Sequence, residues 1–358
     1  MLKTLIFTLI LLWSSGCGRT ADSDSEKRPK SSGKLEFITV EKSHFVAGDM
    51  PGDGHYQTII RTLNKPKIYA QNDALENYKY YSLYENNKHK EESIIGIEKS
   101  NNEIESDVML LLDLSGSIIE GGCNTEGTTC NQLIHAAHAF VNNIITNGNF
   151  KISIYYFNAK REIAPLTRQT EYPTSNVDIL NQAINRLKDS TFIEQYLKGY
   201  ENSTNLYGAV IQSGEKVCSW INCESTETFK MGAVVIFTDG RDLADLVSKK
   251  KMLKSLKKNI QYYTIGIGNA DNKTLIEISG KDRHFEASEN NIEDAFSQTY
   301  NYILYNSSFY RVNYCPSTRE GTVRVKIFFN DTQNHIRAYT EEDKITIPNS
   351  DIRCDIIQ

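Results

Sequence analysis

The chain has 358 residues, of which 39% are hydrophobic and 24% are charged, and this balance excludes a fully disordered or collagen-like protein. Because single cores stop growing at roughly 250 residues, the length predicts more than one domain. Forty Lys and Arg against 45 Asp and Glu leave a formal net charge of −5, which argues against nucleic acid as a main partner. Beyond residue 13 no apolar stretch is long enough to span a bilayer, so we expect no internal transmembrane helix.

Residues 1–16 have the features of a secretory signal. They carry a positive charge near the start, an apolar stretch over 5–13 and small residues before Cys17. The segment resembles the lipobox of bacterial lipoproteins, in which the cysteine is lipidated and becomes the first mature residue, although Ser14 stands where that motif usually has Leu. The alternative is an ordinary signal peptide followed by a chance cysteine.

Residues 17–34 are rich in Ser, Asp, Lys and Gly and contain almost nothing apolar. This composition predicts a flexible tether between a lipid anchor at Cys17 and the folded part. The lipoprotein resemblance implies a lipid-anchored protein of the bacterial cell envelope. It favours the outer membrane or the cell surface, with the periplasmic face as the alternative.

Between residues 106 and 306, apolar runs alternate with segments of helical periodicity. The nearly continuous apolar run over 107–114 is typical of a strand buried on both faces. Strands that alternate with helices predict right-handed crossovers and a largely parallel sheet covered on both faces. The predicted strands are 107–114, 151–157, 233–238 and 261–266, and the predicted helices are 132–145, 177–187, 206–216, 249–258 and 292–305.

The flanking segments 35–105 and 307–358 have the pattern of short alternating strands broken by Gly and Pro. Both flanks are therefore predicted to be β-rich. The pattern leaves open whether they fold together into one β-sandwich-like domain, with the α/β domain as an insertion. The predicted strands are 35–40, 57–61, 309–314, 322–329 and 335–339.

Oxygen-bearing side chains follow two of the buried strands. Asp113, Ser115 and Ser117 come at the end of the first, Asp239 follows the strand over 233–238, and Thr204 opens a helix between them. Because the carboxyl ends of parallel strands line the crevice where ligands bind, we expect these side chains to meet at one solvent-facing rim. Hard oxygen ligands with only two carboxylates suit Mg²⁺ or Mn²⁺ better than a dedicated Ca²⁺ cage, and they do not suit zinc or copper.

The sequence DxSxS at Asp113–Ser117, the TN pair at Thr204 and the TDG triplet that contains Asp239 occur in an order that resembles the von Willebrand factor type A (VWA) domain. The resemblance covers residues 106–306 and implies a Rossmann-like sheet with helices on both sides. It also implies the family's metal-ion-dependent adhesion site (MIDAS). There Ser115, Ser117 and Thr204 would touch the cation, the two aspartates would bind it directly or through water, and one position would remain for a carboxylate of a protein ligand.

Besides Cys17, six cysteines remain, and an even number in an exported chain favours disulfides. Their spacing predicts Cys123–Cys130, Cys218–Cys223 and Cys315–Cys354, although other connectivities and reduced, buried thiols stay open. We expect the first pair beside the metal rim and the second at the opposite pole. Breaking the first is then expected to change partner binding more than stability.

These observations predict an envelope lipoprotein that binds a protein ligand, in the manner of an adhesin, when an Asp or Glu of that ligand reaches the cation. The alternative is an envelope structural or assembly factor whose metal mainly stabilises the fold. A third reading is an accessory subunit like the chelatase components that carry similar domains, and the export signal argues against it. Because no HExxH, GxSxG or P-loop motif is present, we expect no enzymatic activity.

Overall fold

The computed structural model describes part of the chain, and the predicted signal, Cys17, the tether over 17–34 and Cys354 lie outside that part. No helix among the described residues is long and apolar enough to cross a membrane. The described residues are 37–47, 54–63, 80–90, 94–100, 105–197, 199, 203–223, 230–306, 309–315, 321–331, 336–339 and 343–347.

Within these residues a six-stranded sheet, in the order β11-β10-β9-β6-β7-β8, forms the centre of an α/β domain. Neighbouring strands from β11 to β7 pair in parallel, and only the short edge strand β8 runs antiparallel to its neighbour. The predicted fold class, a mostly parallel Rossmann-like sheet flanked by helices, is confirmed. The strands are β6 (Ser106–Asp113), β7 (Phe150–Phe157), β8 (Ala164–Pro165), β9 (Met231–Thr238), β10 (Ile260–Ile267) and β11 (His284–Ala287).

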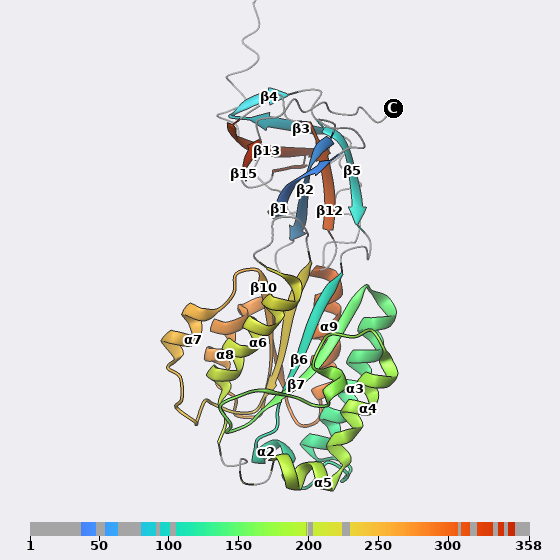
Figure 1. Cartoon of the computed structure of the whole chain (residues 1–358), viewed down its shortest axis with the longest axis vertical. Coiled ribbons are helices and arrows are strands. Elements are labelled where there is room, and N and C mark those ends of the chain that lie inside the picture. The colour runs from blue at the N-terminus through green and yellow to red at the C-terminus, as the bar shows by residue number, and fades with distance from the viewer. Residues whose placement is uncertain are drawn as a thin grey trace, which may run out of the picture.

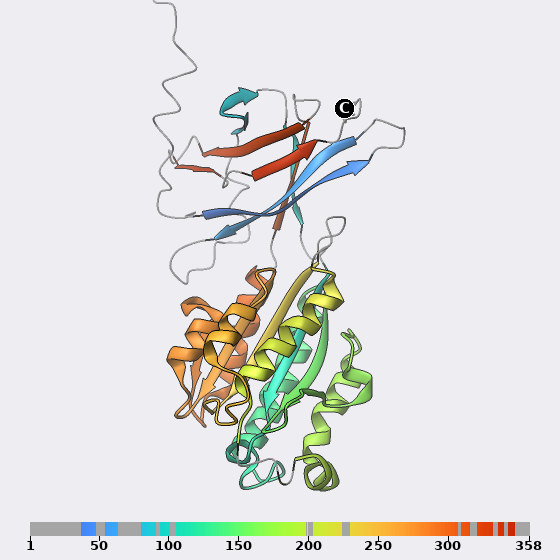
Figure 2. The same cartoon turned by 60° about the vertical axis from the view of Figure 1, so that its left-hand side comes forward.

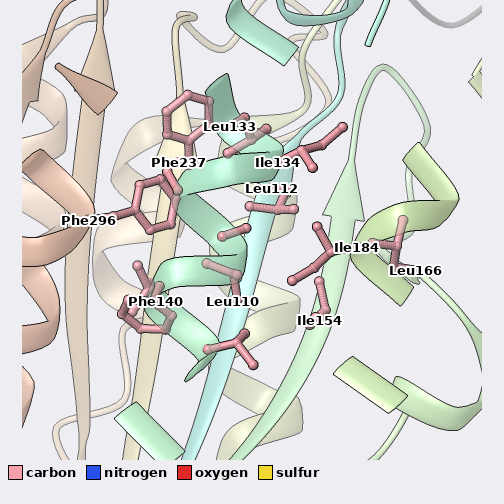
Figure 3. Close-up of a cluster of buried hydrophobic side chains, with 14 of the residues drawn as sticks. Leu110, Leu112, Leu133, Ile134, Phe140, Ile154, Leu166, Ile184, Phe237 and Phe296 are labelled. Atoms are coloured by element: carbon pink, nitrogen blue, oxygen red, sulfur yellow. The ribbon is translucent and has the colours of Figure 1, made fainter. Parts of the chain in front are cut away.

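The sheet lies between two apolar layers because alternate residues of β6 point to opposite faces. Leu110 and Leu112 belong to one buried cluster, together with Phe140 and Phe296 from the covering helices (Figure 3). Met109 and Leu111 belong to the cluster on the other face. The helices are α2 (Gly116–Ile119), α3 (Thr129–Asn147), α4 (Val177–Asn185), α5 (Ser190–Phe192), α6 (Leu206–Ile221), α7 (Lys249–Ser255), α8 (Asn272–Ser279) and α9 (Ile292–Asn306).

Two antiparallel sheets make up a second, β-rich unit, and each contains strands from both flanks of the chain. In one sheet β12 pairs with β2 and β5, and in the other β13 pairs with β3. The two flanks therefore fold together, and the α/β domain is inserted between β5 and β12. The strands are β1 (Phe37–Ala47), β2 (Gly54–Leu63), β3 (Tyr80–Glu85), β4 (Lys88–Lys90), β5 (Ile94–Ser100), β12 (Phe309–Tyr314), β13 (Gly321–Asp331), β14 (Ile336–Tyr339) and β15 (Asp343–Ile347).

The β-rich unit lies beyond the end of the central sheet at which β6 begins (Figures 1 and 2). Helix α2, which directly follows β6, lies at the opposite end of the α/β domain. The carboxyl edge of the sheet, where the predicted metal ligands stand, therefore faces away from the β-rich unit.

Candidate metal site

The predicted ligands meet at the carboxyl edge of β6 and β9. These strands pair in parallel, with Leu112 opposite Phe237, so Asp113 and Asp239 leave neighbouring strand ends. A cavity of about 400 Å³ opens at this edge. Its lining comprises Ser115, Ser117, Ser203, Thr204, Asp239, Gly240, Arg241, Leu243 and Asn269.

Asp113 departs from the predicted solvent-facing position, because its side chain is fully buried, with 0% exposed. It lies close to the cavity lining: a Cβ on Gly240 would stand 3.7 Å from Asp113 Oδ2 and 3.3 Å from Thr204 Oγ1. Ser115 and Thr204 are also buried, whereas Ser117 is exposed. The structure thus brings the five predicted residues together, with Asp113 buried beside the cavity and the other four in its lining.

Hydrogen bonds fix both oxygens of the Asp113 carboxylate. The backbone N–H of Ser115 donates to Oδ1 at 3.0 Å, and the hydroxyl of Thr238 donates to Oδ2 at 2.6 Å. Burial raises the pKa of Asp113 to about 7, with the Thr238 hydrogen bond opposing this rise and the nearby charge of Asp239 adding to it. A divalent cation beside the two carboxylates would favour their charged forms.

Two oxygens in the cavity lining fit a bound cation, since they are buried and have no hydrogen-bond partner among the described residues. They are Oδ1 of Asp239 and Oγ of Ser203. Burial raises the pKa of Asp239, and a hydrogen bond from Ser117 opposes this shift. In the described part of the chain, no group of three or more His, Cys, Asp or Glu side chains is placed so that it could hold a metal ion. The donors at this edge are therefore mainly hydroxyls with two carboxylates, a set suited to a hard cation.

Three further polar residues position the site, and sequence reasoning did not assign them this role. The Thr238 hydroxyl holds Asp113, as described above. The Asn205 side chain accepts from Gly208 N at 3.2 Å as the N-cap of α6 and donates to the carbonyl of Lys160 at 3.0 Å. The carboxylate of Asp242 accepts from a backbone N–H in the first turn of α6. The N-cap position of Asn205 and the place of Thr238 in TDG were the available signals.

Two of the predicted disulfides are present, Cys123–Cys130 and Cys218–Cys223, with Cα–Cα distances of 4.7 and 5.0 Å. Cys123 follows α2, at the cavity end of the domain, and both cysteines of this pair are buried in the core. The second pair lies at the far end of α6, where Asn259, just before β10, donates to the carbonyl of Cys223 at 2.8 Å. Cys315 is also disulfide-bonded, and its predicted partner Cys354 lies outside the described residues.

Comparison with solved structures finds distant likenesses. Proximal thread matrix protein 1 from the mussel byssus is 15% identical with a TM-score of 0.43, and the match covers 58% of this chain and 48% of that one. This chain thus spans about half the length of the mussel protein, which has also been solved with a zinc-occupied MIDAS motif. The manganese-loaded TRAP protein of Plasmodium vivax is 16% identical with a TM-score of 0.40, covering 70% of this chain and 96% of that chain.

The ArnB paralog VWA2 from Sulfolobus acidocaldarius is 16% identical with a TM-score of 0.38, covering 90% of this chain and 74% of that chain. No curated protein matches the chain in sequence. The family model of the von Willebrand factor type A domain matches residues 224–299, which include β9, β10 and Asp239. This match and the sheet topology together identify the chain as one that contains a VWA domain.

Proposed function

We propose that the VWA domain binds a protein ligand through a divalent cation, Mg²⁺ or Mn²⁺, held at the carboxyl edge of β6 and β9. The residues that would hold it are Asp113, Ser115, Ser117, Thr204 and Asp239. The observation that carries the proposal is the unpartnered, buried Oδ1 of Asp239, which lines the same cavity as three hydroxyl-bearing ligands. An oxygen in this state costs stability unless a partner is bound.

When bound, the cation supplies a concentrated positive charge that attracts a ligand carboxylate. The chain's own residues provide the rest. Three of the five donors are neutral hydroxyls, so only the two carboxylates offset the charge of a divalent ion. The site therefore remains receptive to one more carboxylate, from a ligand. Thr238 and the Ser115 backbone hold Asp113 in place, and the cavity leaves room for an incoming side chain. We therefore propose a binding role rather than a catalytic one.

Isothermal titration of Mg²⁺ and Mn²⁺ into the purified protein tests the metal site. We expect Asp113→Asn and Asp239→Asn to abolish measurable binding, because each substitution keeps the shape of the side chain and removes one charge. The matched control is Asp178→Asn, at an exposed position in the first turn of α4, which should bind as the unmodified chain does. Unchanged affinity in both site variants would refute the assignment.

Access of a ligand carboxylate can be measured separately by water-proton relaxation in the Mn²⁺-loaded protein. A bound Mn²⁺ ion with exchangeable water enhances relaxation, and N-acetyl-aspartate amide should reduce this enhancement by displacing that water. The uncharged asparagine analogue should have no effect. Equal effects of the two compounds would contradict carboxylate binding at the metal.

We further propose that Cys17 carries a lipid that anchors the protein in the bacterial cell envelope, on the strength of the signal sequence and the polar tether that follows. Mass spectrometry of the mature N-terminus tests this. The unmodified chain should begin with an acylated Cys17, and Cys17→Ser should be soluble or remain uncleaved. A mature chain that begins at another, unmodified residue would exclude lipidation.

A further inference from the structure

The segment after β9 carries two exposed leucines beside the metal cavity. Leu243 is 65% exposed and Leu246 is 46% exposed. Together with Tyr172 they are the large apolar side chains that stand exposed in the described part of the chain. Leu243 also lines the cavity, next to Thr204 and Asp239. We call residues 241–246 the leucine loop.

The exposure of these leucines does not come from a loosely held backbone. The carbonyl of Thr204 accepts hydrogen bonds from the backbone N–H of Leu243 at 2.9 Å and of Ala244 at 3.2 Å. Within the loop, the Asp242 carboxylate accepts from Tyr207 N at 2.9 Å, at the start of α6. The leucine loop is therefore tied to the same residue, Thr204, that the proposed metal site uses.

An apolar side chain at the edge of a binding cavity favours association, because burying it removes apolar surface from water, and a backbone that is already anchored has little entropy left to lose. Isolated exposed leucines are common on protein surfaces. Here, however, both stand on one short, anchored loop, and one of them contacts the cavity itself. Arg241 of the same loop also lines the cavity and adds a positive charge.

We infer that the leucine loop selects the partner: the ligand is a protein segment in which the metal-binding Asp or Glu is flanked by an aliphatic residue. The carboxylate would enter the cavity, toward the cation and Arg241, while the aliphatic neighbour packs on Leu243 and Leu246. This inference rests on the proposed function and adds the chemistry of the residue beside the carboxylate.

Two fluorescein-labelled heptapeptides provide the probes, one with the centre Leu-Asp-Leu and the other with Ser-Asp-Ser, both flanked by Gly and Ser. Fluorescence anisotropy with the Mn²⁺-loaded protein should give about tenfold tighter binding of the leucine peptide, since partial burial of one leucine side chain accounts for such a factor. The double variant Leu243→Ser/Leu246→Ser should bind the two peptides equally and should titrate Mn²⁺ as the unmodified chain does.

The matched control is Tyr172→Ser, at a similarly exposed apolar position. The nearby Thr174 pairs with Ile152 at the start of β7, so Tyr172 lies away from the cavity. This variant should keep the tenfold preference. Metal-dependent binding of both peptides without preference, or a preference that survives in the double variant, overturns the inference and leaves the proposed function intact. Binding that persists in Asp239→Asn, or no binding of either peptide to the metal-loaded protein at millimolar concentration, overturns both.

Discussion

The hydroxyl of Thr238, on β9, donates a hydrogen bond of 2.6 Å to Oδ2 of Asp113, on the neighbouring strand β6. The same hydroxyl accepts from the backbone N–H of Gly240 at 3.1 Å. One buried side chain thus connects the Asp113 carboxylate with the turn that carries Asp239. A residue that does not itself line the cavity thus holds the Asp113 side chain and the backbone next to Asp239.

Thr238→Val should lower the affinity for Mn²⁺ by about tenfold, since partners that orient metal ligands typically contribute such a factor. It should also lower the free energy of unfolding by about 1–3 kcal/mol, because it leaves a buried carboxylate oxygen without its donor. Calorimetric titration and urea denaturation measure the two effects. Thr264→Val, a buried position on β10 whose hydroxyl bonds to Ser279, should lower stability without changing metal affinity. Equal metal affinities in the two variants would contradict the positioning role.

Gly240→Ala should weaken metal binding several-fold while the domain stays folded. The added Cβ would stand 3.3 Å from Thr204 Oγ1, a tight contact that requires the hydroxyl to move by a few tenths of an ångström. The residue is only half-buried, so its backbone has room to adjust with little loss of stability. Titration of Mn²⁺ together with a thermal melt checks the result, and an unchanged metal affinity would contradict the expected displacement of the Thr204 hydroxyl.

Removal of Cys123–Cys130 by a double substitution to Ala should lower the free energy of unfolding more than removal of Cys218–Cys223. Each short loop contributes about 2 kcal/mol by closure entropy. The cysteines of the first pair are 1% and 0% exposed, so their loss also leaves a cavity in the core. This burial adds a stability effect to the change in partner binding expected from breaking the first bond, and that change stays a prediction. Urea denaturation measures the two losses in free energy of unfolding. A larger loss on removal of Cys218–Cys223 would contradict the prediction.

Glu105→Gln should destabilise the protein by about 0.5 kcal/mol at pH 7, a small value because the ion pairs are partly solvated. Glu105 Oε1 lies 2.6 Å from Lys230 Nζ and 3.0 Å from Lys151 Nζ. The hydrogen bond from Lys230, then that from Lys151, holds the pKa of Glu105 below its ordinary value. A depressed pKa stabilises the fold above the unfolded-state pKa, and this contribution is lost as the pH falls through the folded-state value.

The stability difference between Glu105→Gln and the unmodified chain should therefore be constant above about pH 5 and shrink toward zero as the pH falls below about 4. It should also shrink in 1 M salt, which screens such pairs. Urea denaturation across this range provides the measurement. A difference that grows on acidification would contradict the assignment.

The central strands were predictable from sequence, because β6 and β9 carry continuous apolar runs, which are typical of strands buried on both faces. The structure buries both strands along their length. Helix α8 and strand β11 were not predicted. β11 is a short edge strand without a fully buried residue, so its sequence shows no strong pattern. In the flanks, β1, β2, β12, β13 and β14 were visible as alternation, whereas β3, β4, β5 and β15 were not predicted as strands. The alternation also does not say which strand pairs with which.

The candidate site was likewise predictable only in part: its motifs are local, but the contacts that hold them depend on how the strands pair. The three motifs placed Asp113, Thr204 and Asp239 at strand and helix ends that the parallel topology brings together. The burial of Asp113 and its bond to Thr238 depend on the register between β6 and β9, which no local pattern encodes. Likewise, the tie between the Thr204 carbonyl and Leu243 becomes visible only once the chain is folded.

The insertion of the α/β domain between β5 and β12 has a consequence for the order of folding. Ser100 of β5 pairs with Phe309 of β12, so β5 emerges during synthesis long before its neighbour. Forming this pair directly would require closing a very long flexible loop, at an entropic cost that rises with its length. A folded α/β domain replaces that loop with a compact body whose first strand and last helix are already positioned. Its folding should therefore precede, and accelerate, closure of the β-rich unit, and a destabilised α/β domain should leave unpaired strands exposed to aggregation.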